Sequence, residues 1–338
     1  MNKSYSISLL LLFILLFLFI ILSLKIGQLN ISFSEIFEVL QNKDDSLTRD
    51  VIVNLRLPRI LFAALTGCGL ALCGYVMQAS IQNVLADPYI LGVSSGAALG
   101  AAFAILVGFP LLLDHNLPQE ITVSAWAFIG AISAITIANI IAGYKRKQTN
   151  TRLILAGVIV NVLCTAISNM LIYLANDVEG IRSITFWTMG SLANISWLQV
   201  IMLAVFLLFS ILYFFTQFRT LNILSLGEET ASTLGINIYR KRKVYILIVT
   251  ILTGIMVAQC GIIGFVGLIV PHAVRAVCKT ANSNILPLVL LSGSVFLVLV
   301  DLLSRILIEH QEVPIGIITS IIGAPIFLLI FLKQNYGS

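Results

Sequence analysis

Long apolar runs, separated by short polar segments, divide this chain along its whole length. A bilayer core of about 30 Å needs roughly 20 apolar residues per helix, so each run is read as a membrane-spanning helix. Ten such helices are predicted, at residues 7–24, 57–80, 92–113, 121–143, 153–175, 197–216, 244–260, 262–278, 285–304 and 314–333. The pattern predicts an all-α, polytopic membrane protein with about ten transmembrane helices, in a single transmembrane domain over residues 1–338.

Two of the polar segments are longer than the others. Residues 25–56 contain an amphipathic stretch from Ile31 to Leu40, and residues 217–243 contain a helix-compatible stretch between Gly227 and Gly235. Loops of this length in compact domains commonly carry function. We expect each of the two segments to offer a surface to a partner protein.

Small residues recur at helical spacing in several runs. Gly92, Gly96 and Gly100 follow one another at intervals of four. Such a ridge lets two helix backbones approach closely in lipid. The spacing predicts a tightly packed helix bundle, which we favour over the alternative, a direct role of a glycine in substrate binding.

Composition supports a membrane location and excludes several other classes. Apolar residues make up 59% of the chain and charged residues 10%, whereas soluble domains carry about 25% charged residues. The net charge of +5 is too dilute for a nucleic-acid-binding protein. The five cysteines contain no C-x-x-C spacing and the three histidines lie far apart in the chain, so we expect neither a metal site nor a cofactor.

The basic residues indicate which side of the membrane each loop faces. With ten spans, one set of alternating segments holds thirteen Lys and Arg against three acids, and the other holds seven against twelve. Loops rich in Lys and Arg stay on the cytoplasmic side. Both termini and residues 217–243 are therefore predicted to be cytoplasmic, and residues 25–56 to be outside.

The sequence lacks two signatures, that of a nucleotide-hydrolysing protein and that of an ion-coupled carrier. It contains no G-x-x-x-x-G-K-[ST] phosphate loop, so any ATP dependence would come from a separate ATPase and the chain itself is not predicted to be an enzyme. The interiors of the predicted spans hold almost no acids, histidines or lysines, which ion-coupled carriers commonly place there. This argues against an ion-coupled secondary transporter, which remains an alternative function.

Several motifs in order along the chain resemble the FecCD-type permeases, the membrane subunits of ABC importers for ferric siderophores, haem and cobalamin. The motifs are RLPR at 56–59, QNVLADP at 82–88, LGVSSGA at 91–97, LGEETASTLG at 226–235, GFVGLIVPHAVR at 264–275, DLLSR at 301–305, PIGIIT at 314–319 and GAP at 323–325. The resemblance implies the fold of a type II ABC importer permease in a bacterial cytoplasmic membrane. It also implies three partners: a cytoplasmic ABC ATPase dimer, an extracytoplasmic substrate-binding protein and a second permease subunit.

The resemblance assigns the binding-protein contact to arginines. In similar permeases, arginines at the positions of Arg56, Arg59 and Arg305 receive carboxylates from the binding protein. Charge complementarity of this kind sets register and association rate. The alternative is pairing within the chain, since Asp301 lies four residues before Arg305 on the same helical face.

The resemblance assigns the ATPase contact to residues 226–235, which are similar to the coupling helices that seat in an ATPase groove. The candidate coupling residues are Leu226, Gly227, Glu228, Glu229, Ala231, Leu234 and Gly235. The two acids predict a basic groove on the ATPase. The basic run at 240–243 is interpreted as an anchor at anionic lipid headgroups.

The remaining candidates concern the translocation pathway. In similar proteins an Asn and a Leu of the loop after the second span help to form the inner gate, which points to Asn83 and Leu85. The fifth span carries a polar stripe of Asn161, Thr165, Ser168 and Asn169, which would line a pathway or hydrogen-bond to another helix. We expect the importer to carry ferric siderophore by alternating access, with haem or cobalamin as alternative substrates.

Overall fold

The computed structural model describes residues 3–27, 31–41, 47–108, 119–144, 149–277, 285–308 and 311–333, and every regular element in these ranges is a helix. Seven helices there are long and apolar enough to cross a membrane, and three further apolar helices, 93–107, 266–276 and 315–329, are shorter. The ten fall on the ten predicted spans and confirm an all-α polytopic fold. Several residues counted in the sequence lie outside the described ranges: Lys43, His115, Cys278, Lys279, His310 and the basic run at 145–147.

The described residues group into two compact units, and each is considered by itself. The first unit comprises Met1–Tyr75, Ser191–Phe218 and Ile263–Ser338, and the second comprises Val76–Gly190 and Arg219–Ile262.

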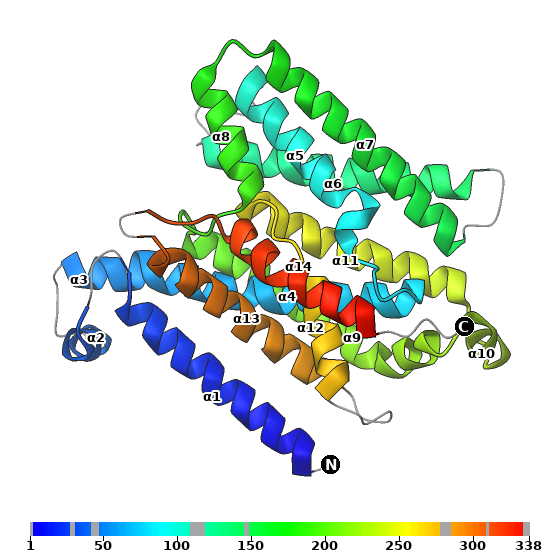
Figure 1. The fold of residues 1–338 in the computed structure, drawn as a ribbon, viewed down its shortest axis with the longest axis horizontal. Helices are drawn as coiled ribbons and strands as arrows, with labels where there is room; N and C mark the ends of the chain where they lie inside the picture. Colours follow the sequence, from blue (N-terminus) through cyan, green and yellow to red (C-terminus); the bar gives the residue numbers. More distant parts are fainter. Residues whose placement is uncertain are drawn as a thin grey trace. The chain divides into compact units, whose positions relative to one another are not determined.

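The first unit is built on helices from both ends of the chain. Its elements are α1 (Lys3–Lys25), α2 (Phe33–Leu40), α3 (Leu47–Asp50), η1 (Val51–Arg56), most of α4 (Leu57–Ile81), most of α9 (Trp197–Ser225), α12 (Val266–Val277), α13 (Leu286–Ile306) and α14 (Ile315–Lys333). In Figure 1, α1 runs beside α13, with which it packs. The carbonyl of Gly293 lies where a Cβ on Gly67 would stand, so α4 and α13 touch backbone to backbone.

The second unit contains the middle of the chain. Its complete elements are η2 (Pro88–Leu91), α5 (Val93–Ala102), η3 (Phe103–Val107), α6 (Gln119–Gly143), α7 (Asn150–Leu174), α8 (Val178–Met189), α10 (Glu228–Thr233) and α11 (Ile238–Cys260). Helices α5, α6 and α7 pack against one another, as Figure 1 shows. Gly96 and Gly100 lie against the α6 backbone at Gly130 and Trp126, which confirms the predicted close approach of helices.

Gly92 does not belong to this packing ridge. Its φ of +89° is in the left-handed region, where it ends η2 and starts α5. A side chain there would be strained, so glycine is required by the turn rather than by helix contact.

The segment predicted as a loop at 217–243 is mostly helical. Helix α9 continues to Ser225 and α11 begins at Ile238, so α10 and its two short connections are all that separate them. Hydropathy marks where a helix leaves the membrane, whereas the helix itself continues until a backbone signal stops it. Gly227, with φ +130°, provides that signal after α9.

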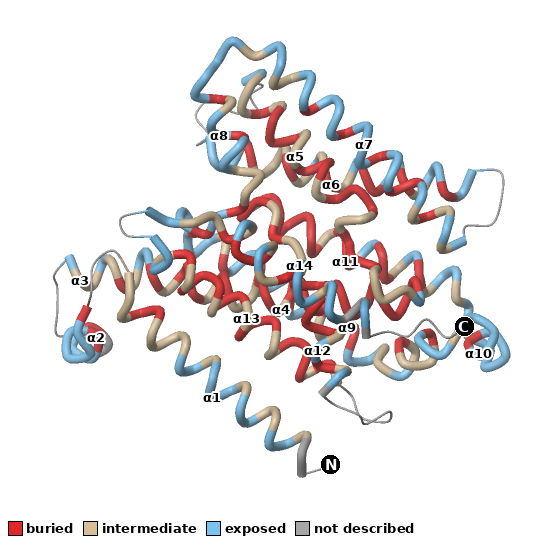
Figure 2. Tube along the Cα trace, in the orientation of Figure 1, coloured by how far each residue is buried: buried red, intermediate tan, exposed pale blue. Residues whose placement is uncertain are grey.

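Burial separates the helices by their surroundings. Figure 2 shows long exposed stretches on α1 and α7, and mostly buried positions along α4 and α13. The exposed side chains of α1 include Leu10, Phe13 and Phe17, each at least 60% exposed. An apolar surface on a spanning helix is satisfied by lipid or by another subunit.

Candidate functional site

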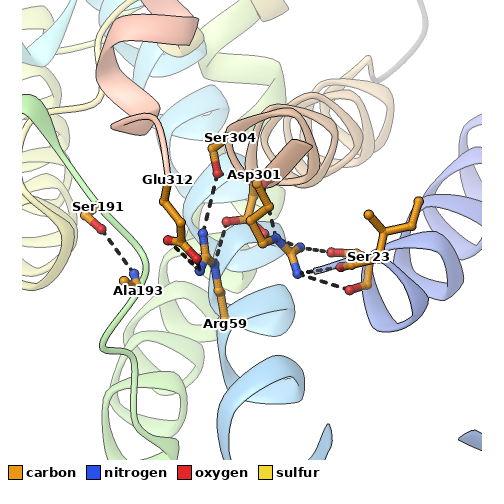
Figure 3. Close-up of polar contacts among 9 residues, drawn as sticks. Ser23, Arg59, Ser191, Ala193, Asp301, Ser304 and Glu312 are labelled. Atoms are coloured by element: carbon orange, nitrogen blue, oxygen red, sulfur yellow. Dashed lines mark hydrogen bonds and ion pairs between the residues drawn. The ribbon is translucent and has the colours of Figure 1, made fainter. Parts of the chain in front are cut away.

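The predicted docking arginine Arg59 belongs to a buried ionic cluster at the start of α4. Its Nε donates to Asp301 Oδ1 at 2.8 Å, and its Nη1 donates to Glu312 Oε1 and Oε2 at 2.8 and 2.9 Å. Figure 3 shows Arg59 pointing between Asp301 and Glu312, with Ser304 on its other side. The Asp301 side chain has no exposed surface, whereas Glu312 is 30% exposed.

The other two arginines are held by the end of α1. Arg305 Nη2 donates to Asp301 Oδ2 at 2.6 Å and to Ser23 Oγ, and Arg305 Nη1 donates to the Ser23 carbonyl at 3.1 Å. Arg56 Nη1 donates to the carbonyls of Leu24 and Lys25. The last carbonyls of a helix lack partners within it, so these guanidinium groups cap α1.

These six residues, Ser23, Arg56, Arg59, Asp301, Arg305 and Glu312, are called the arginine cluster below. The structure shows the alternative that the sequence left open, because Arg305 pairs with Asp301. Arg59 also has a partner within the chain. Of the carboxylates in the cluster, that of Glu312 is the one that solvent reaches.

The predicted coupling segment forms the short helix α10. Glu228 lies at its start and its Oε1 accepts a hydrogen bond from Arg242 Nη2 at 2.5 Å. Arg242 is buried, with 7% of its side chain exposed, so it differs from the exposed Arg240 and Lys243 beside it. The prediction of a lipid anchor at 240–243 is therefore wrong for Arg242, which turns inward to an acid.

The other coupling candidates divide into buried and exposed positions. Ala231 is fully buried and holds α10 to the chain. Leu226 and Leu234, on either side of the helix, are 73% and 61% exposed, and Glu229 is exposed as well. Gly227 and Gly235 have φ of +130° and +75° and shape the two turns. Exposed leucines in a polar connection are the kind of surface that partner proteins cover.

The predicted gate loop is a compact turn after α4. Asn83 Oδ1 accepts from the N–H of Leu85 at 2.9 Å, and Asp87 caps η2 by accepting from the N–H of Tyr89 at 2.8 Å. Burial raises the pKa of Asp87 to about 6, although the hydrogen bond from Tyr89 opposes the shift. Asn83 and Leu85 are both half-buried.

The polar stripe of α7 borders two adjoining hollows in the second unit. One cavity of about 210 Å³ is lined by residues of α5, α7 and α8, and the other is lined by α7 alone; they share Thr165 and Asn169. Asn161, Thr165 and Asn169 are exposed, whereas Ser168 is buried and donates to the Cys164 carbonyl at 2.9 Å. Three of the four predicted residues thus form an open polar surface, and the fourth is turned into its own helix.

Some residues of these sites escaped the sequence analysis. Thr185 and Thr188 of α8 line the first cavity, and α8 itself was not predicted because it is too short for a span. Its caps were readable: Asp177 accepts from the N–H of Glu179, and Gly190 follows the last turn. Asn150, which bonds Glu228 of α10, and Ser80, whose carbonyl accepts from Arg242, carry no signal in a single sequence.

Comparisons with known proteins agree with the geometry. The family model described as the FecCD transport family matches residues 14–333. The hemin transport system permease protein HmuU of Yersinia pestis is 36% identical over 316 residues, which cover 93% of this chain and 91% of that protein. The vitamin B12 import system permease protein BtuC of Vibrio cholerae is 37% identical over 290 residues, 86% of this chain and 85% of that protein.

A solved structure shares the fold. It is described as an inward-facing conformation of a metal-chelate type ABC transporter, and it matches with a TM-score of 0.83 and 32% sequence identity. The match covers 96% of this chain and 99% of the other. The range that the family model matches, residues 14–333, includes α10 as well as the spans that follow α1.

Proposed function

This chain belongs to the FecCD transport family and is a permease of the ABC importer class in the cytoplasmic membrane, and from this premise we propose that its substrate is a ferric siderophore. The observation that carries the proposal is the polar lining of the α7 cavity. Serine, threonine and asparagine supply its polar groups, and the rest of the lining is alanine and isoleucine. Hydroxyl and amide groups hydrogen-bond an oxygen-rich chelate weakly, as a pathway that must release its cargo requires.

The same lining supports one candidate substrate over another. Haem iron is commonly held by His, Cys, Met or Tyr, and none of these is among the residues lining the cavity. This favours a siderophore over hemin, the cargo named for the Yersinia relative. Cobalamin, which the Vibrio relative imports as vitamin B12, also presents amides and stands as the second candidate.

ATP hydrolysis is proposed to occur in a separate cytoplasmic ABC ATPase dimer. The sequence has no phosphate loop. Leu226, Glu229 and Leu234 offer the exposed surface around α10 that such a partner would cover. ATP can shift a conformational equilibrium of the transporter only if it binds the two conformations with different affinities. The surface around α10 must therefore contact the ATPase differently in each conformation.

An extracytoplasmic binding protein is proposed to dock at the arginine cluster. Arg59 is the best candidate to receive its carboxylate, since the Glu312 that now holds it is partly exposed and can be displaced. Arg56 and Arg305 would set the local positive field while continuing to cap α1. A second permease subunit and cytoplasmic termini complete the proposed assembly.

The first experiment is gentle affinity purification of the tagged chain from its native membranes, with mass spectrometry of the proteins that accompany it. We expect a P-loop ATPase, a binding protein and a second permease or a second copy. Uptake is then measured with radioactive iron in a hydroxamate siderophore, with hemin and with cobalamin. Uptake of hemin or cobalamin but not of the iron chelate would overturn the proposal that the substrate is a ferric siderophore.

The competing function is tested in the same membranes. An importer of this class should lose uptake when ATP is depleted and retain it when an ionophore collapses ion gradients. A chain that purifies alone, and whose uptake is abolished by the ionophore but not by ATP depletion, would be an ion-coupled secondary transporter instead.

A further inference from the structure

The acid at the start of α10 is bonded to two other helices. Glu228 Oε1 accepts from Arg242 Nη2 at 2.5 Å and from Asn150 Nδ2 at 3.2 Å. Arg242 lies in the first turns of α11, and Asn150 is the first residue of α7. The position of α10 is therefore fixed by the ends of two spanning helices.

The same two side chains hold the end of α4. Arg242 Nε donates to the Ser80 carbonyl at 3.1 Å, and Asn150 Nδ2 donates to the Ile81 carbonyl at 3.0 Å. The last four carbonyls of a helix find no N–H donor within that helix. The two bonds therefore supply donors to carbonyls of α4 that would otherwise lack them. Each donor thus joins α10 to the final turn of α4.

A third bond joins the two segments from the other side of Gly227. Gln82, the residue after α4, has φ +54° and donates from Nε2 to the carbonyl of Leu224 near the end of α9, at 2.9 Å. Residues 80–82 are consequently linked to both sides of the turn into α10, to Leu224 directly through Gln82 and to Glu228 through Arg242 and Asn150. The gate loop at 83–88 begins directly after residue 82.

The chemistry of Arg242 makes it suited to transmit movement. Its planar guanidinium holds two acceptors in fixed directions at once, which a lysine cannot do. It is buried, so leaving its acceptors is costly, whereas Glu228 is 47% exposed. Movement of α10 that kept this ion pair would carry the end of α4 with it.

We propose that Arg242, Asn150 and Glu228 form a clamp of positioning residues that transmits displacement of α10 to the end of α4 and thereby to the gate loop. The inference rests on the proposed coupling of α10 to an ATPase. It assigns Glu228 to contacts within the chain and leaves Glu229, Leu226 and Leu234 as the surface for the ATPase.

The test uses the full complex, with the ATPase that co-purifies, in lipid vesicles. A cysteine at position 85, introduced as Leu85→Cys into a chain whose native cysteines are replaced by alanine, reports the gate loop. Its labelling rate with a membrane-impermeant maleimide is compared without nucleotide and after trapping with ATP and vanadate. This readout needs no knowledge of the substrate.

We expect trapping to change the labelling rate of the cysteine at position 85 when the clamp is unmodified. Each of three substitutions should reduce that change by about fivefold or more, the scale of a typical coupling between sites: Arg242→Gln, Glu228→Gln and Asn150→Ala. Asn150→Ala removes one uncharged amide and keeps the ion pair, so it tests the clamp even if Arg242→Gln folds poorly. The double variant Glu228→Gln with Arg242→Gln should be no worse than the worse single variant, since both act in one link.

The matched controls are Arg240→Gln and Lys243→Gln, which remove exposed charges from the same basic run. Both should keep the full response to trapping, and Arg242→Gln and Asn150→Ala should keep the ATPase bound and hydrolysing. A full response in the three clamp variants, with the ATPase bound, overturns the clamp alone. An unmodified chain to which no ATPase binds overturns the proposed coupling as well.

Discussion

The arginine cluster and the α10 clamp use the same chemistry for different ends. In both, a guanidinium group donates to a carbonyl in the last turn of a helix and also to an acid. In the arginine cluster that acid, Asp301, has no exposed surface and is shared by two arginines. In the clamp, Glu228 is half exposed and bonds one arginine.

The two acids differ in exposure, and this difference sets the cost of removing the charge that each one pairs with. A buried charge whose partner is removed has no access to water, and the penalty is several kcal/mol. A half-exposed carboxylate can be hydrated when its partner is deleted, so removing the arginine of the clamp costs less than removing Asp301. In the intact chain the buried Arg242 keeps the clamp's ion pair together. We infer that the arginine cluster holds α1, α4 and α13 together, while the clamp moves with α10 and keeps its contacts to the end of α4.

The largest effect is expected from Asp301→Asn. The substitution leaves Arg59 and Arg305 buried with one fewer negative charge, which should cost about 3–5 kcal/mol of stability. The measurement is the thermal unfolding midpoint of the purified chain in detergent. Glu312→Gln, at the partly exposed edge of the same cluster, is the control and should cost about 1 kcal/mol. Equal losses in the two variants would contradict the role assigned to burial.

Asp87 sharpens the comparison as a buried acid outside both clusters. Its pKa of about 6 lies above the ordinary 3.8, so the folded chain binds a proton that the unfolded chain has released between these values. Stability should therefore rise as pH falls from about 6 to about 4 and be lost as pH rises, by roughly 3 kcal/mol in all. Asp87→Asn keeps the acceptor for Tyr89 and should flatten this dependence in unfolding scans at several pH values; an unchanged slope would assign it to another group.

Arg242→Gln should destabilise the chain less than Asp301→Asn does. Glu228 stays hydrated when its partner is lost, and the Ser80 carbonyl loses one hydrogen bond, so about 1–2 kcal/mol is expected. Thermal unfolding under the conditions used for Asp301→Asn makes the two losses comparable. A loss as large as that of Asp301→Asn would show that the clamp is as rigid as the arginine cluster.

The smallest effect on stability is expected from Glu229→Lys, which lies on the exposed side of α10. Unfolding should shift by less than about 0.5 kcal/mol. Association with the ATPase should slow, and more so at low salt, because charge complementarity acts mainly on encounter. The association rate is measured by surface-immobilised binding at two salt concentrations. Unaltered association at both would remove Glu229 from the proposed contact.

Much of the fold was predictable because each span carries its own signal. Ten apolar runs gave ten helices in the described residues, and the spacing of Gly96 and Gly100 correctly indicated a close contact, here with α6. Helix ends were predicted less well, since α9 and α11 continue past their apolar residues. Helix α8 was missed because its twelve residues lack a long apolar run, although Asp177 and Gly190 mark both its ends.

The candidate sites were predictable as segments but not as contacts. The motif around 226–235 identified α10, yet nothing in one sequence distinguishes Glu228 from Glu229, or Arg242 from Arg240. The polar stripe of α7 identified three exposed residues, whereas the partners Thr185 and Thr188 come from a helix that no stripe indicated. A one-dimensional pattern shows which residue types are present, and pairing depends on the direction of each side chain.

The sequence by itself determined the number of spans and the family, because apolar length and ordered motifs are properties of consecutive residues. The tertiary structure alone decided which charges are paired. Arg59 lies 242 positions before the aspartate that it contacts, and Arg242 lies 162 positions after the carbonyl that it caps. Contacts at such separations arise only when the packed helices bring their ends together, and burial then decides how costly it is to remove the partner of each charge.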